Sequence, residues 1–226
     1  MRPRALCDRL NQFLVTGLTN EVFLAVQHHI LDGPPRRQTL SPVSAPGMIS
    51  PAGISANEFL GILDENRYSA VFADGALVII ECAFADDHLE SHRYSYIPCP
   101  VDSALLLLRP EEITIADWLR DVVLAEGIGV FRSVGTYRFD CTRIVPLTRT
   151  NPHPLSHLTF ASADCRVPVK GPLSIADFMN FIFDNFYRHH RRLWLDYSSH
   201  LTCIGTEPTI TWEEQQLHHL HWEDAL

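Results

Sequence analysis

The sequence predicts an α+β domain, with an antiparallel sheet of about five to six strands, N-terminal helices and a C-terminal helical layer. Segments 68–72, 77–84, 90–97 and 130–141 are rich in β-branched and aromatic residues, and Asp74-Gly75 is typical of a hairpin turn. Strands joined by short turns pair antiparallel. Because helical patterns lie at both ends of these strands, we expect helices segregated from the sheet, as in α+β domains.

The N-terminal region shows a helical spacing of apolar residues. Between residues 4 and 31 they recur at intervals of three and four, which predicts two helices broken near Gly17. The next segment, 33–54, contains five prolines, which disfavour a long helix or a central strand. We expect a Pro/Gly-rich surface loop there, or a cover over a site.

Capping boxes mark four helix starts. In each, a Ser or Thr precedes an acidic residue by three positions, so that each side chain satisfies a free backbone amide. The pairs are Ser55 with Glu58, Thr114 with Asp117, Ser174 with Asp177, and Thr211 with Glu214. Short strands are expected at 158–160 and 166–169. A wide apolar stripe over 174–190 predicts the main helix over the sheet, and 205–226 is expected to hold a C-terminal helix.

Composition limits the class of protein. The 226 residues fit one domain, 1–226, and the net charge of -9 means that nucleic-acid binding needs a local basic patch. Six scattered cysteines without C-x-x-C spacing indicate reduced thiols in a cytoplasmic protein. The first 18 residues lack an apolar leader, and the longest apolar run, 76–85, contains Glu81, so neither a signal peptide nor a membrane span is expected.

Residues 137–172 hold the densest set of chemically active side chains. In a strand, Arg138 and Asp140 share one face, opposite Tyr137, Phe139 and Cys141. A charged face of this kind suits a catalytic site. The alternative is a structural ion pair at a sheet edge.

Two histidines lie in the same region. His153 and His157 are four apart, but Pro154 between them excludes the helical metal-binding pair. Beside Arg166 and Lys170, two imidazoles can act as base and acid in metal-free cleavage of a phosphodiester. The alternative is that they cap strand ends.

A metal site is a further alternative. It would use Glu81, Asp140, His157 and Asp164, although no ligand motif joins them. We therefore expect no metal and no other cofactor.

Arg188-His189-His190-Arg191-Arg192 is a concentrated basic run. Cations at a helix end favour the helix dipole and need no ligand. The functional alternative is that Arg188, Arg191 and Arg192, with Lys170, contact a phosphate backbone while Trp194 and Tyr197 stack on a base.

Several motifs carry a family resemblance. The patterns HPxSHLT from His153, CRxPVxGP from Cys165 and FIxxNFY from Phe181 resemble an uncharacterised bacterial domain-of-unknown-function family over about 89–187. Such families are similar to cargo of mobile and antiphage-defence loci. More distantly, the layout resembles small ribonuclease toxins of toxin–antitoxin pairs, in which an Asp-Asn step stands where this chain has Asp140-Cys141.

These observations support two functional hypotheses. The first is a cytoplasmic bacterial toxin or antiphage-defence protein acting on RNA or DNA, as a metal-independent endoribonuclease. His157 and His153 would transfer protons, Arg138 and Arg166 would bind phosphate, and Asp140 would orient a histidine. The second is a non-catalytic subunit, an antitoxin or defence-complex scaffold, that binds a partner protein encoded nearby. The polar strand face favours the first, and the acidic charge favours the second.

Overall fold

The structure is a computed structural model that describes residues 2–44, 54–101, 103–106, 108–126, 135–143, 154–160, 165–198, 201–202 and 205–221. Its helices are α1 (Pro3–Thr19), α2 (Ala56–Asp64), α3 (Ser103–Leu106), α4 (Ile115–Glu126), α5 (Ile175–Asn185), the 3-10 helix η2 (Arg188–His190), α6 (Arg191–Ser198) and α7 (Trp212–Gln215). Its strands are β1 (Phe23–Val26), β2 (His29–Asp32), β3 (Arg37–Pro42), β4 (Ala70–Phe72), β5 (Leu77–Ala85), β6 (His88–Ile97), β7 (Tyr137–Thr142), β8 (Ser156–Phe160) and β9 (Arg166–Pro168).

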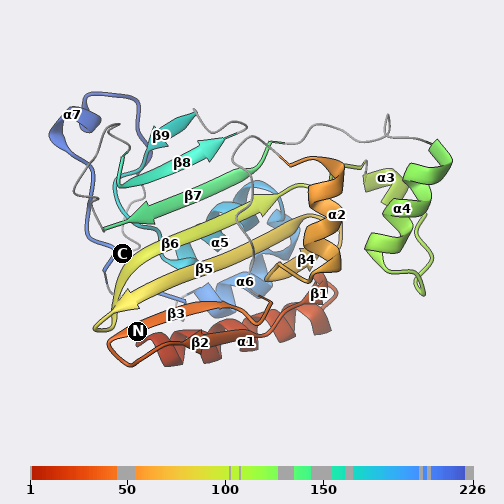
Figure 1. Cartoon of the computed structure of the whole chain (residues 1–226), viewed down its shortest axis with the longest axis horizontal. Coiled ribbons are helices and arrows are strands. Elements are labelled where there is room, and N and C mark those ends of the chain that lie inside the picture. The colour runs from red at the N-terminus through yellow and green to blue at the C-terminus, as the bar shows by residue number, and fades with distance from the viewer. Residues whose placement is uncertain are drawn as a thin grey trace.

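All these strands form one antiparallel sheet, which confirms the α+β class (Figure 1). The order is β1-β4-β5-β6-β7-β8-β9, while the β2–β3 hairpin pairs with the second half of β5. Within the described residues the sheet has nine strands, more than the five or six predicted. The difference arises mainly before residue 43, where three strands form.

The prediction of a second N-terminal helix was wrong. Helix α1 ends at Thr19, Glu21 takes a positive φ of 58°, and the chain turns back into β1 and β2. A Cβ added at Gly17 would lie 2.3 Å from the Phe23 ring, so Gly17 permits the close return of β1 onto the helix. Gly17 is therefore a packing position inside α1.

The prediction that 33–54 is a loop was also wrong in part, within residues 33–44, and residues 45–53 lie outside the described ranges. Strand β3 occupies Arg37–Pro42, and Pro42 is its last residue. Pro34 lies in the turn before it, where its carbonyl accepts the Arg37 amide hydrogen at 2.8 Å. The prolines therefore border the strand, where no ladder bond is lost.

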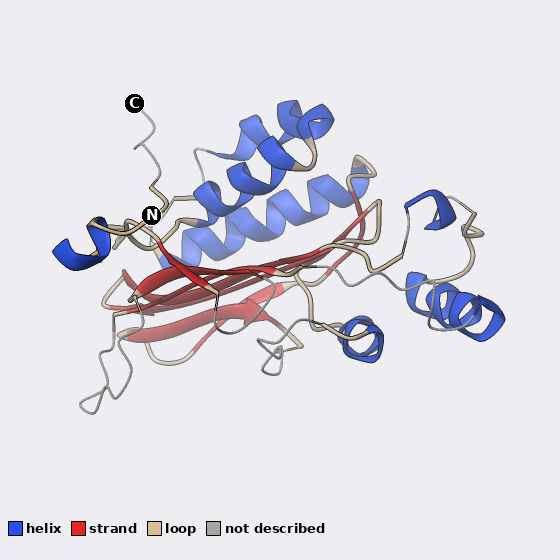
Figure 2. Ribbon diagram, turned by 90° about the horizontal axis from the view of Figure 1, so that it is seen from above, coloured by secondary structure: helices blue, strands red, loops and turns tan. Residues whose placement is uncertain are grey.

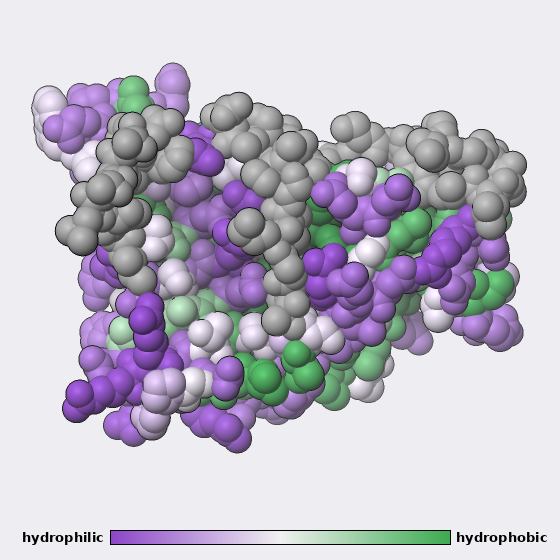
Figure 3. Space-filling model, viewed as in Figure 1, coloured by the Kyte–Doolittle hydropathy of each residue, from purple (hydrophilic) through white to green (hydrophobic). Residues whose placement is uncertain are grey.

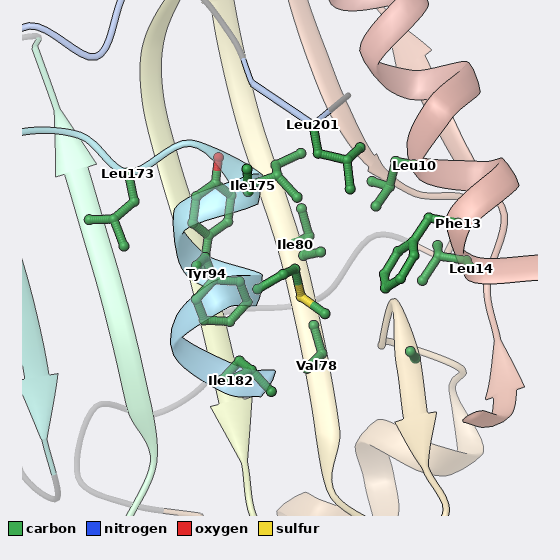
Figure 4. Packing of buried hydrophobic residues seen from close by; sticks show 14 of the residues in the cluster. Leu10, Phe13, Leu14, Val78, Ile80, Tyr94, Leu173, Ile175, Ile182 and Leu201 are labelled. Carbon is green, nitrogen blue, oxygen red and sulfur yellow. The ribbon is translucent and has the colours of Figure 1, made fainter. Parts of the chain in front are cut away.

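One face of the sheet is covered by α1, α5 and α6 (Figure 2). The capping box of Ser174 and Asp177 starts α5 as predicted, and α5 packs Ile175 and Ile182 against Val78 and Tyr94 of the sheet (Figure 4). Trp194 of α6 completes the layer. This face holds the main core, as expected for the apolar stripe of 174–190, although α5 ends at Asn185.

The other face is divided between an apolar and a polar half. Helix α2 packs Phe59 and Ile62 over Leu77 and Ile79 of β5, and α4 joins the same cluster. The next residue of β5 on this face is Glu81, where the apolar cover ends. The polar half of this face is therefore the place for a site.

Of the predicted helix over 205–226, the described residues 205–221 form one short turn, α7, beginning at the Thr211 capping box, and residues 222–226 lie outside the described ranges. Beyond it the chain turns, and Leu220 pairs with Val169 in a parallel bridge. The Lys170 amide donates to the Leu220 carbonyl at 2.7 Å, and the Leu220 amide donates to the Pro168 carbonyl at 2.9 Å. At Leu220, these bonds to Pro168 of β9 and to Lys170 beyond it stand in place of the predicted helical bonds.

Two buried histidines make the stability of the fold depend on pH. Burial lowers the pKa of His29 and that of His92 from 6.5 to about 4. The Nδ1–H of His92 donates to the Phe139 carbonyl and its Nε2 accepts the Leu173 amide hydrogen, so the neutral ring satisfies both partners. The folded state therefore resists protonation at both rings.

We expect the free energy of unfolding to be highest above pH 6.5 and to fall as the pH decreases from 6.5 towards 4, because the unfolded chain binds protons first. Each shift of this size corresponds to roughly 3 kcal/mol. Urea unfolding at pH 7.5 and pH 5 measures the decrease in the free energy of unfolding. The decrease should be the same in the control His218→Ala, because residue His218 is exposed. Equal stability at the two pH values would contradict the assignment.

Candidate functional site

Four ionisable residues form a row across the polar half of the sheet. Glu81 of β5 is opposite Arg93 of β6, Arg93 is opposite Asp140 of β7, and Asp140 is opposite His157 of β8. Residues directly opposite one another in paired strands point to the same face. The fold thus aligns a Glu, an Arg, an Asp and a His that are separated by up to 76 positions in the sequence.

A second row lies beside the first, two residues along each strand. Ser95 is opposite Arg138, Arg138 is opposite Thr159, and Thr159 is opposite Arg166 of β9. Ser95 and Thr159 are buried, and within the described residues neither hydroxyl has a hydrogen-bond partner. This row brings two guanidinium groups next to the ionisable row.

The residues of the two rows, except Ser95 and Thr159, line a hollow of about 500 Å³. Its wall is made of Thr39, Glu81, Cys82, Ala83, Ser91, His92, Arg93, Arg138, Asp140, Cys141, Thr142, Leu155, His157 and Arg166. Figure 3 views this face and shows hydrophilic residues over β6 and β7. The volume of the hollow is in the range of small-ligand sites in proteins.

Asp140 is the centre of the hollow. Its Oδ2 accepts a hydrogen bond from Arg138 Nε at 2.6 Å, and its Oδ1 accepts one from Arg93 Nε at 3.0 Å. Burial favours the neutral carboxyl, but the two guanidinium groups outweigh it and lower the pKa of Asp140. The shared face of Arg138 and Asp140 is confirmed. Their ion pair lies in the interior of the sheet, since β7 is bordered by β6 and β8, and not at an edge.

His157 presents a basic nitrogen to the hollow. Its Nδ1 is 3.0 Å from the Pro154 carbonyl, which only accepts, so Nδ1 carries the hydrogen and Nε2 is bare in the neutral ring. Burial lowers the pKa of His157, the charge of Asp140 opposes this, and Arg166 and Arg138 lower the pKa further. The lowered pKa favours the neutral form of His157. Its orientation comes from a backbone carbonyl, while Asp140 Oδ2 lies 3.7 Å from Nε2.

Glu81 and Arg93 belong to the hollow. Glu81 was named only as a ligand in the metal alternative, and Arg93 was not predicted as a site residue. Burial raises the pKa of Glu81; Arg93 opposes this and Asp140 adds to it. A sequence indication existed for Glu81, since it is the one charged residue in the apolar run 76–85. Arg93 had no comparable indication, because only the pairing of β6 with β5 and β7 places it in the row.

The predicted nucleic-acid residues do not come together at the hollow. Arg188, Arg191 and Arg192 lie where η2 leads into α6, on the helix-covered face of the sheet (Figure 2). Arg188 Nε donates to the Asp184 carbonyl, and Arg191 Nε lies 3.0 Å from Asp184 Oδ1. Lys170 follows β9, and His153 lies outside the described residues.

The functional alternative in which Trp194 stacks on a base is excluded by the structure. The indole is fully buried, stacks on Phe183 at 5.5 Å between ring centroids, and donates its Nε1–H to Asn180. It is a core residue. The metal alternative also finds no support in the described ranges, where no three His, Cys, Asp or Glu residues come together as ligands, and Asp164 lies outside them.

Comparison with known proteins assigns a family. The family model described as an uncharacterized conserved protein, DUF2290, matches residues 48–222. The chain belongs to the DUF2290 family. The DUF2290 match includes β4 to β9 and hence both rows of the hollow, whereas α1 to β3 precede it. No curated protein and no solved structure matches the chain. Within the described residues, each helix is too short or too polar to cross a bilayer.

Replacing the central carboxylate should destabilise the fold. In Asp140→Asn, Arg138, whose side chain is 11% exposed, loses its counter-ion, and we expect the free energy of unfolding to fall by about 3 kcal/mol. Denaturant unfolding measures the change. The control Asp8→Asn removes an exposed i,i+4 partner of Arg4 and should leave stability almost unchanged. Equal effects of the two substitutions would refute the central role of Asp140.

The pKa of His157 should depend on the charges around it. We expect NMR titration of the wild type to give a value below 6.5. Arg166→Gln removes a repelling cation and should raise the pKa, whereas Asp140→Asn removes an attracting anion and should lower it. Arg188→Gln, on the other face, is the control without effect. Shifts of the opposite sign would show that the ring does not sense these groups.

Proposed function

We propose that this chain is a cytoplasmic bacterial toxin or antiphage-defence protein that cleaves RNA as a metal-independent endoribonuclease. The observation that carries the proposal is the unprotonated Nε2 of His157. This residue lines a hollow together with Arg93, Arg138 and Arg166. A neutral imidazole beside cations is the arrangement that general-base catalysis on a phosphate ester requires.

Charge supports a phosphate ligand. Three guanidinium groups, those of Arg93, Arg138 and Arg166, line the hollow together with the two carboxyl groups of Glu81 and Asp140. The hollow is therefore positive by one charge in a chain whose net charge is -9. Such a local cationic site can hold a phosphate although the protein as a whole repels polyanions.

The residues suggest a cleavage step. His157 Nε2 removes the proton of a ribose 2′-hydroxyl, and the resulting oxygen attacks the adjacent phosphorus. Arg138 and Arg166 stabilise the added negative charge on the phosphate oxygens. The bond from phosphorus to the 5′-oxygen then breaks, and that oxygen takes a proton from an acid, a role we assign to His153. The products are a 2′,3′-cyclic phosphate and a free 5′-hydroxyl.

A protein-binding subunit is the second candidate, either an antitoxin or a scaffold of a defence complex. It is favoured by the acidic net charge and by apolar side chains that the helical layer exposes, namely Val15 and Leu18 of α1 and Leu195 of α6. In that case the ions around Asp140 would only stabilise the sheet. A cleavage assay separates the two candidates.

We expect the purified chain to cleave labelled RNA in the presence of a chelator and to leave DNA intact, since DNA lacks the 2′-hydroxyl. His157→Ala should reduce the rate about 100-fold or more, because a general base contributes at least this factor. His218→Ala, an exposed histidine, is the matched control and should retain full activity. Expression should slow bacterial growth with the wild type and not with His157→Ala. A folded wild type that leaves RNA intact would overturn the proposal.

A further inference from the structure

We infer that Glu81 and Arg93 form a base-recognition subsite, and that the base it selects is guanine, on the nucleotide that supplies the attacking 2′-hydroxyl. The inference rests on the proposed function, because it takes the phosphate to lie near Arg138 and His157. The inference extends the proposed function by naming the base that the hollow accepts. Distance, charge partnering, donor pattern and the surrounding space support it.

The distance between Glu81 and His157 separates their roles. They lie in the same row but three strands apart, which corresponds to about 14 Å between their backbones. A proton donor must come within about 3 Å of the atom it serves. Glu81 therefore cannot be the acid that acts on the same phosphorus–oxygen bond as His157. The separation is one that a nucleotide spans from its phosphate to the edge of its base.

The ion pairs of the hollow centre on Asp140 and not on Glu81. Arg138 and Arg93 both direct their Nε–H groups to Asp140. Glu81 is half-buried, and burial raises its pKa. A partly desolvated carboxylate gains most from a ligand that brings its own N–H donors.

The donor pattern of the base decides which base fits Glu81. A carboxylate accepts two parallel hydrogen bonds when two donors lie side by side. On the Watson–Crick edge of guanine, N1–H and the N2 amino group are adjacent donors. Adenine and cytosine place an acceptor beside their amino group, and uracil has a single N–H between two carbonyls. Guanine is therefore the base whose edge fits Glu81.

The space around Glu81 suits a ring system. Ala83, Thr39 and Ser91 line the hollow there, and they are small residues, two of them with hydroxyl groups. The Arg93 side chain is 40% exposed while Asp140 fixes its guanidinium, which offers a flat cationic surface for stacking on a base. The subsite thus has an edge-reading group, a stacking surface and room for a base.

The test is binding of the four nucleoside 3′-monophosphates to the full chain by calorimetry. We expect guanosine 3′-monophosphate to bind roughly tenfold or more tightly than the other three, the discrimination typical of a bidentate base contact. Glu81→Gln replaces one acceptor by a donor and should abolish the preference. Glu213→Gln, an exposed residue of α7, is the matched control and should keep it. Thermal unfolding of both variants verifies that they are folded.

Three results would overturn the inference: equal affinity for all four nucleotides, a guanine preference that survives Glu81→Gln, or binding of none of them. The wild-type comparison decides the matter even where Glu81→Gln does not fold. Cleavage of RNA is a separate readout. If guanosine 3′-monophosphate is preferred through Glu81 but RNA stays intact, the guanine subsite is supported and the proposed nuclease activity is refuted. If RNA is cleaved without base preference, the nuclease activity is supported and the guanine subsite is refuted.

Discussion

The carboxylate of Asp140 is the interaction on which the polar half of the sheet depends. A buried charge is tolerated only when it is paired and hydrogen-bonded, and Asp140 meets this condition with Arg138 on its own strand and Arg93 on the next. By fixing both guanidinium groups it defines the floor of the hollow. Asp140 also places a negative charge beside His157, and this charge opposes the lowering of the His157 pKa by burial.

The face of the sheet that carries Asp140 is divided into an apolar and a polar half, and this division explains how a charged hollow can exist on a stable sheet. Along β5, Leu77 and Ile79 pack under α2, and Glu81 comes next on the same face where that packing ends. The opposite face is covered along its length by α1, α5 and α6, and it supplies the large apolar core. The large apolar core is thus concentrated on one side, which leaves part of the other side free to carry charged residues.

Features that depend on local periodicity were predictable from the sequence. The alternation of a strand places Arg138 with Asp140 and His157 with Thr159, and both pairs share a face as expected. Which strands are neighbours is decided by long-range pairing, so the approach of Glu81 and Arg93 to Asp140 could not be predicted. The segment 23–32 was misassigned because Val22, Phe23, Val26 and Ile30 suit a helix by spacing and a strand by residue type. Its outcome depends on the packing of Phe23 against Gly17.

The bridge between Leu220 and Val169 has a consequence for the behaviour of the protein in solution. An uncovered edge strand presents unpaired amide and carbonyl groups on which another chain can add a strand. Leu220 occupies part of that edge at β9, bonding to Pro168 and Lys170, and Pro168 is opposite His157. Leu220 therefore leaves fewer backbone groups of this edge open to pairing with another chain. The same bonds tie its position to β9, the strand that pairs with His157, the catalytic histidine of our proposal.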